Sequence, residues 1–172
     1  MIKSLLSLAA SVSLAAVWIA PLPASAATAT PRAKATLAVL HPLTLVLKGD
    51  LDFGTIAKTG AGTAVVEPVA NVMTTTGGVL PLAGTPTAAT FLGAAGSSSV
   101  VIIRIPKTAI LITRVGGTET MSVSDFTLQG QDKRTLARQE SFEFRVGATL
   151  TVGAAQADGT YVGTFDVTVQ YP

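Results

Sequence analysis

The chain has 172 residues, a formal net charge of +2 and 48% hydrophobic residues. So small an excess of positive charge does not predict a nucleic-acid partner, which usually requires a clustered basic face. The chain contains no cysteine, which excludes disulfides, thiolate metal sites and cysteine nucleophiles.

The N-terminal residues have the pattern of a secretory signal peptide. Lys3 provides a positive start, an apolar run extends from Leu5 to Ala20, and Ala24 and Ala26 are the small residues that a signal peptidase recognises. A membrane anchor is the alternative, but the run is short for a span of ~20 residues, and no positive stop-transfer flank follows it. We therefore expect cleavage after Ala26, export to the periplasm or cell surface, and no membrane span in the mature protein.

A flexible segment, 27–34, is expected to precede a single all-β domain over 35–172. Val, Ile, Thr and Gly dominate this region, and turn signals such as "KTGAG", "TTTGG" and "RVGGTET" separate short apolar runs. This spacing predicts an immunoglobulin-like antiparallel β-sandwich. The expected strands cover residues 35–40, 43–48, 51–56, 62–67, 88–93, 98–105, 109–114, 118–128, 141–152 and 160–171.

The first expected strands, within 35–48, have two interpretations. Their apolar residues alternate in two runs separated by Pro42: Leu37 and Val39, then Leu43, Leu45 and Leu47. Alternation of this kind is typical of a strand with one buried face. The segment is either the first strand of the chain's own sandwich or a donor strand that completes a neighbouring molecule.

Two segments in the middle of the chain differ from the alternating strands. The run "VVIIRIP", 100–106, is apolar on both faces, which favours a central strand, although a strand lining a groove has the same pattern. Arg104, Pro106 and Lys107 at its end are typical of residues that prevent edge-to-edge pairing. Residues 131–141 are rich in helix formers and predict a loop with one helical turn.

The last two expected strands have the clearest period of two. In 141–152 one face carries Phe142, Phe144, Val146, Ala148, Leu150 and Val152. In 160–171 one face carries Tyr161, Gly163, Phe165, Val167, Val169 and Tyr171. Each pattern predicts one buried and one wet face. The short link "GAAQADGT" suggests that the two strands form a hairpin.

The sequences "LDFGTI" and "LTVGAAQADGTYVGTFDVTVQY" resemble a bacterial secreted family, domain of unknown function 4402, which is related to fimbrial subunits. The end of the chain is also similar to subunits of chaperone–usher pili, with Tyr171 next to last and Gly159 fourteenth from the end. The resemblance implies a final strand that pairs with a periplasmic chaperone and, at an usher, with the N-terminal strand of a neighbouring subunit. The cysteine pair of many pilins is missing here.

Candidate catalytic and metal-ligating residues are few. His41 is the only histidine, and a turn or strand-end role is favoured over a general base, because no G-x-S-x-G elbow accompanies the serines at 97–99. Asp50 and Asp52 could begin a calcium site, but the further ligands of a calcium loop are missing, which favours a turn. We expect no metal and no cofactor.

Charged residues near the end of the chain also have two readings. Glu140 and Glu143 could form a glycosidase pair, but on a strand they point to opposite faces. Lys133, Arg134 and Arg138 form a modest basic cluster that we interpret as an exposed loop.

The sequence therefore predicts a non-enzymatic structural or adhesive subunit of a fimbria-like surface structure, assembled by β-strand addition. The alternative is a self-complete periplasmic or cell-surface binding module. Its ligand would contact the loops at 93–99, 115–119 or 130–140.

Overall fold

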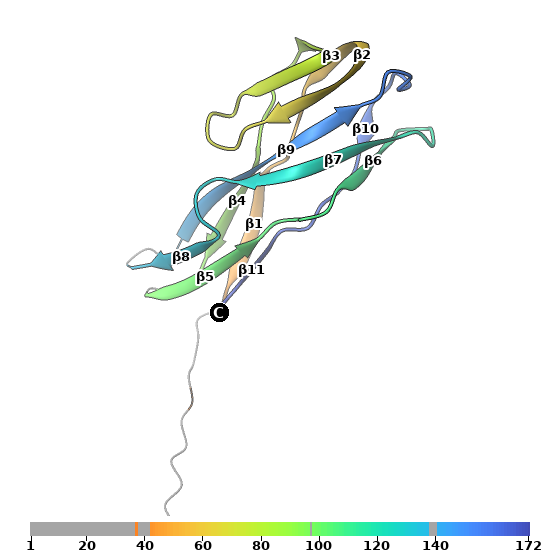
Figure 1. Ribbon diagram of the computed structural model, residues 1–172. Helices are drawn as coiled ribbons and strands as arrows, with labels where there is room; N and C mark the ends of the chain where they lie inside the picture. The colour runs from red at the N-terminus through yellow and green to blue at the C-terminus, as the bar shows by residue number, and fades with distance from the viewer. Residues whose placement is uncertain (1–36, 38–41, 97, 138–140) are drawn as a thin grey trace, which may run out of the picture. The chain divides into compact units, whose positions relative to one another are not determined.

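The computed structural model describes residues 37, 42–96, 98–137 and 141–172 (Figure 1). The expected signal peptide and the segment 27–34 lie outside these residues. Ala38–Pro172 form one compact unit. Its described residues form antiparallel strands and no helix, and therefore no helix that could cross a membrane. The prediction of an all-β antiparallel fold is confirmed.

The strands follow one another through the described part of the unit as β1 (Thr44–Gly49), β2 (Thr55–Val66), β3 (Met73–Ala83), β4 (Ala89–Ala94), β5 (Ser99–Arg104), β6 (Ile110–Arg114), β7 (Thr120–Leu128), β8 (Lys133–Leu136), β9 (Ser141–Val152), β10 (Tyr161–Val162) and β11 (Thr168–Gln170).

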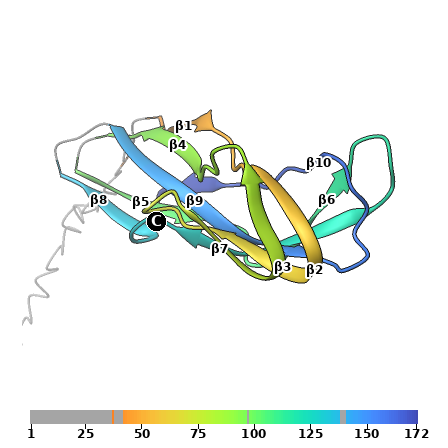
Figure 2. The same ribbon diagram turned by 90° about the horizontal axis from the view of Figure 1, so that it is seen from above.

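The first sheet is built around β9. Its strand order is β1-β4-β9-β7-β6-β10, and β2 pairs with both β9 and β3. One edge of β9 is shared, because β4 pairs with its first half and β2 pairs with its second half. Figure 2 shows β9 crossing the unit with β1 and β4 on one side and β7 on the other. The even-numbered side chains from Phe142 to Val152 are buried, as their alternation predicted.

The second sheet, β11-β5-β8, continues the first sheet around a bend. The first sheet contains the adjacent strands β7, β6 and β10, and the second sheet contains β8, β5 and β11 in the corresponding order. Each strand of the first set is connected along the chain to its counterpart in the second: β7 to β8, β6 to β5 and β10 to β11. At β7 the bend coincides with a bulge between Ser124 and Thr127, where Asp125 has a φ of 48°. Bulges increase local twist and bend a strand. The second sheet therefore lies over one end of the first (Figure 1).

The two sheets enclose a buried cluster that we call the lower cluster, because β5 and β8, which contribute to it, lie low in Figure 1. Phe144 is 0% exposed and stacks on Phe91 and Phe142, with ring centroids 5.2 Å and 6.1 Å away. The cluster consists of Ala89, Phe91, Ala95, Val101, Ile103, Leu136, Phe142, Phe144 and Val146. Since the chain has no cysteine, apolar burial of this kind replaces disulfides as the means of holding the sheets together.

A second cluster, the upper cluster, is formed by side chains of the β2–β3 hairpin, β7 and β9. The hairpin register shifts between Lys58 and Gly62, and Gly77 has a φ of 65°. A Cβ on Gly62 or Gly78 would overlap the backbone of the opposite strand, so the two strands approach each other closely at this bend. The cluster consists of Ala64, Val79, Met121, Val123, Ala148, Leu150 and Val152.

Several sequence predictions about these elements were wrong. The strands expected at 51–56 and 62–67 form one long strand from residue 55, because the glycines of "KTGAG" make a bulge and not a turn. The strand β3 was missed, because "TTTGG" within it was interpreted as a turn signal. Residues 133–136 form β8 in place of a helical turn, because they pair with β5.

One prediction concerned residues 100–106 in the middle of the chain. β5 lies between β11 and β8, so the interpretation of "VVIIRIP" as a central strand is confirmed. The expected hairpin between 141–152 and 160–171 was wrong, because β9 pairs with β2, β4 and β7, whereas β10 pairs with β6. The connection between them crosses to the far edge of the sheet.

Candidate functional site

The C-terminal segment 160–171 was expected to be a single strand, and in the structure it divides between the two sheets. Tyr161 and Val162 pair with β6 in the first sheet, and Thr168–Gln170 pair with β5 in the second. A Cβ on Gly163 would lie 2.6 Å from the Ile112 Cγ2 atom, so the chain passes very close to β6 at this point. The single-strand prediction was wrong because the chain has to follow the bend between the sheets.

The predicted alternation persists across this break. The odd-numbered residues except Gly163 are half-buried, and the residues between them are exposed. Phe165 lies with its ring centroid 5.0 Å from that of Phe126. The side chains of Phe165, Val167, Val169 and Tyr171 pack against the lower cluster, and that of Tyr161 packs against the upper cluster. The segment thus presents one apolar face to both clusters.

The start of the C-terminal segment is held by polar contacts. The Tyr161 hydroxyl donates to the Ala157 carbonyl and accepts from the Gln156 amide, both at 2.7 Å. Gly159 has a φ of 144° and lies against the Arg114 side chain. Arg114 in turn pairs with Glu119 at 2.7 Å, and its guanidinium holds the pKa of the Glu119 carboxyl below its ordinary value. These contacts explain the residue types at 159 and 161 without a ligand.

β1 is an edge strand of the first sheet, and β11 is an edge strand of the second. β11 pairs only with β5, through Val169 opposite Ile103, and β1 pairs only with β4 among the strands of the described chain. Leu45 of β1 and Val169 of β11 both pack against the lower cluster, so both edges border this cluster. We call this pair of edges the open seam.

Apolar side chains along the open seam are incompletely covered. Leu43 and Leu45 are half-buried against the lower cluster. Leu47 lies opposite the buried Phe91 and so points to the inward face of the sheet, yet 51% of its surface is exposed. An inward-facing leucine of a central strand would be covered by the opposing sheet. The second sheet therefore does not extend over β1 at this position.

The structure separates the residues expected to act as donor or first strand. Leu45 and Leu47 belong to β1, which pairs with β4 of the same chain, so 44–49 is a first strand in its own sheet. Val39 lies outside the described residues, and Leu37 is 88% exposed.

The margin on the β8–β9 side is closed, and Arg134 closes it. The Arg134 guanidinium donates to the carbonyls of Glu143 (2.9 Å), Gln131 (3.2 Å) and Gln129. Its carbon atom lies 5.7 Å from the centre of the Phe144 ring, and burial lowers its pKa. Arg134 was predicted to lie in an exposed basic loop. That was wrong, because the side chain folds back across β9; no local pattern signals this.

The other candidate residues do not form a catalytic set in the described chain. The Asp52 carboxylate accepts from the Gly54 amide at 2.7 Å, as a turn residue does, and Glu143 pairs with Lys48 at 2.9 Å. The described residues hold no group of three acidic, cysteine or histidine side chains that could bind a metal ion. His41, Ser97, Arg138 and Glu140 lie outside the described residues.

Comparison with known proteins is consistent with the resemblance seen in the sequence. No curated protein and no solved structure matches the chain. The family model described as "Domain of unknown function (DUF4402)" matches residues 43–171, which includes every strand from β1 to β11. The chain therefore belongs to the DUF4402 family.

Proposed function

We propose that the protein is an exported, non-enzymatic subunit of a fimbria-like surface structure, with a pilin-like sandwich that assembles by β-strand addition. The observation that supports this proposal is the open seam, where an outer strand of each sheet borders incompletely covered apolar side chains. Such a margin offers an incoming strand both backbone hydrogen bonds and an apolar slot. The signal-peptide pattern of residues 1–26 supports export.

In this mechanism β11 is the receiving strand. Its inward residue Val169 packs against the lower cluster, while its outer edge is the margin at which another strand adds. The donor is the N-terminal segment of a neighbouring subunit, in which Leu37 and Val39 alternate. Before assembly, a periplasmic chaperone occupies the same margin, and an usher exchanges it for the donor.

The absence of cysteine from the chain allows a direct test by disulfide cross-linking. We would express the chain without residues 1–26, carrying Val39→Cys and Val169→Cys, and oxidise it over a range of protein concentrations. Strand addition brings paired Cα atoms to about 4.4–6.8 Å, which permits a disulfide. The proposal predicts a ladder of covalent multimers whose yield rises with concentration.

A control protein carries Val39→Cys and Thr118→Cys. Thr118 lies in the turn between β6 and β7, which belongs to neither edge of the open seam. The control protein is expected to give no ladder beyond a background of random dimers. A yield for the Val39/Val169 protein equal to that of the control would contradict strand addition at β11.

A self-complete binding module is the second candidate, and the pairing of β1 with β4 of the same chain favours it. In that case residues 35–43 would cover their own seam. The same cross-linking experiment then gives a disulfide within each monomer, with a yield independent of concentration.

A further inference from the structure

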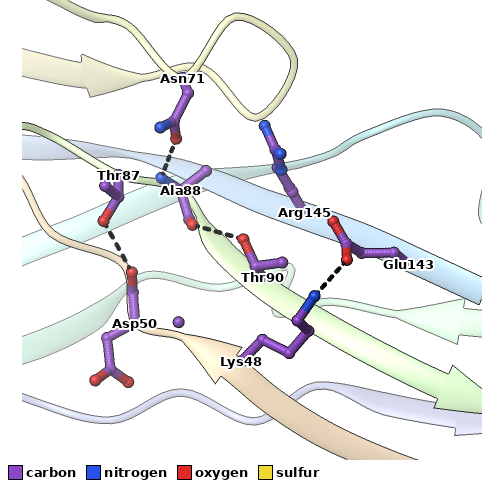
Figure 3. Close-up of a pocket in the computed structure, with 9 residues that line it drawn as sticks. Lys48, Asp50, Asn71, Thr87, Ala88, Thr90, Glu143 and Arg145 are labelled. Carbon is purple, nitrogen blue, oxygen red and sulfur yellow. Dashed lines mark hydrogen bonds and ion pairs between the residues drawn. The ribbon is translucent and has the colours of Figure 1, made fainter.

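A pocket on the outer face of the first sheet carries polar groups that no part of the proposed assembly uses (Figure 3). It has a volume of about 340 Å³ and lies where β1, β4 and β9 meet the loop between β2 and β3. This volume is at the lower end of the range for small-molecule sites. The lining residues are Lys48, Gly49, Asp50, Asn71, Thr87, Ala88, Thr90, Glu143 and Arg145.

Arg145 is the cation of the pocket whose donors are available to a ligand. It projects from the central strand β9 and is half-buried, and its guanidinium makes no hydrogen bond or ion pair with the described residues. Its nearest acidic neighbour on the strand, Glu143, is hydrogen-bonded to Lys48 at 2.9 Å, and Arg145 adds only the smallest of the charge effects that lower the Glu143 pKa. A guanidinium presents a planar fork of donors that matches a carboxylate. The Arg145 guanidinium is therefore suited to bind an anionic group of a ligand.

Asn71 forms the opposite wall and is held rigidly. Its backbone has a φ of 56°, its amide donates to the Glu67 carbonyl at 3.0 Å, and its side-chain Oδ1 accepts from the Ala88 amide at 2.7 Å. Because Oδ1 is committed, the two donors of the Nδ2 amide remain for a ligand.

The threonines supply acceptors. The Thr87 hydroxyl donates to the Asp50 carbonyl at 3.2 Å, and the Thr90 hydroxyl donates to the Ala88 carbonyl at 3.3 Å. Each hydroxyl has thus used its only proton, and its oxygen can accept from a ligand hydroxyl. In Figure 3 the Asp50 carboxylate points away from the other drawn side chains, so it does not oppose an anion beside Arg145.

We propose that this pocket binds a sugar acid, a small molecule with one carboxylate and several hydroxyls. Arg145 receives the carboxylate, Asn71 donates to a ring or hydroxyl oxygen, and Thr87 and Thr90 accept from hydroxyls. The pocket residues lie on the outer face of the sheet, whereas the apolar residues of the open seam lie on the inner face. Ligand binding therefore does not depend on strand addition, and either proposal can fail alone.

The test is a titration of the isotope-labelled protein with D-glucuronate, followed by the backbone amide signals of Ala88, Thr90 and Arg145. The proposal predicts saturable shifts at these residues, and binding at least tenfold weaker for D-glucose and for acetate, each of which has only half of the recognised groups. Arg145→Gln is expected to weaken glucuronate binding at least tenfold. The matched control Arg104→Gln removes an exposed arginine outside the pocket and leaves binding unchanged.

Asn71→Asp provides a second variant that keeps the fold. Aspartate retains the Oδ1 acceptor for Ala88 and tolerates positive φ, but it replaces the Nδ2 donors with negative charge. We expect at least a tenfold loss of glucuronate binding with unchanged thermal unfolding. The absence of saturable shifts, equal binding of glucose or acetate, or full binding by Arg145→Gln would each overturn the proposal.

Discussion

The two margins of the lower cluster are built differently. On the β8–β9 side, Arg134 donates to carbonyls from three residues and covers Phe144, so both sheets are joined by charge-assisted hydrogen bonds. On the β1–β11 side, the described residues provide no strand that pairs across the gap, and Leu47 is half-exposed although it points inward. One margin is closed by contacts within the described residues, and the other leaves apolar side chains partly exposed.

Arg134 of the second sheet is joined to β9 of the first sheet by its hydrogen bond to Glu143 and by its contact with Phe144, and neither contact involves the open seam. We therefore expect substitutions to cost more stability near the closed margin than along the open seam.

The largest effect is expected for Phe144→Ala. Phe144 is fully buried and stacks on two other rings, and removal of such a side chain typically lowers the free energy of unfolding by about 3–5 kcal/mol. Denaturant unfolding measures the change. Thr151→Ala, on the exposed face of the same strand, serves as the control and is expected to change stability by roughly 0.5 kcal/mol or less.

A matched pair of leucine substitutions compares the two margins directly. Leu136 on β8 is 6% exposed, and its replacement by alanine is expected to cost about 2–4 kcal/mol. Leu47 on β1 is 51% exposed and loses less buried surface, so Leu47→Ala is expected to cost about 1 kcal/mol or less. Equal losses in denaturant unfolding would show that the seam is as well covered as the closed margin.

Arg134→Met tests the closure itself. The methionine fills part of the space but leaves carbonyls of Gln129 and Glu143 without their donor, which costs about 1–3 kcal/mol. Arg104→Met, at an exposed arginine of β5, is the control and is expected to be near neutral. If both variants unfold at the same denaturant concentration, Arg134 does not hold the margin.

The smallest effect concerns pH at the start of the C-terminal segment. Arg114 lowers the pKa of Glu119 in the folded protein, so the contact stabilises the fold above the unfolded pKa and is lost as the pH falls through the folded pKa. We expect the Glu119 side-chain NMR signal to titrate at a lower pH in the wild type than in Arg114→Gln. Identical midpoints would mean that the pair does not form in solution.

The sequence alone determined which faces of the main strands are buried. Alternation predicted the buried side of β9 from Phe142 to Val152 and the apolar side of 160–171, because side chains of a strand point alternately to opposite faces whatever the strand pairs with. It also identified β5 as a central strand. It did not predict β3 or β8, because a glycine pair in β3 was read as a turn and the helix formers in β8 favoured a helical turn.

Only the tertiary structure decided the pairings and the sites. The period of two does not say which edge a strand joins, so the sequence placed β9 in a hairpin with the C-terminal segment, whereas β10 and β11 lie in different sheets. In the sequence Arg134 lies in a basic, polar run, and Arg145 lies on the polar face of an alternating strand between Phe144 and Val146. One closes the fold and the other lines a pocket, because distant segments approach them, and contacts between distant segments leave no local pattern.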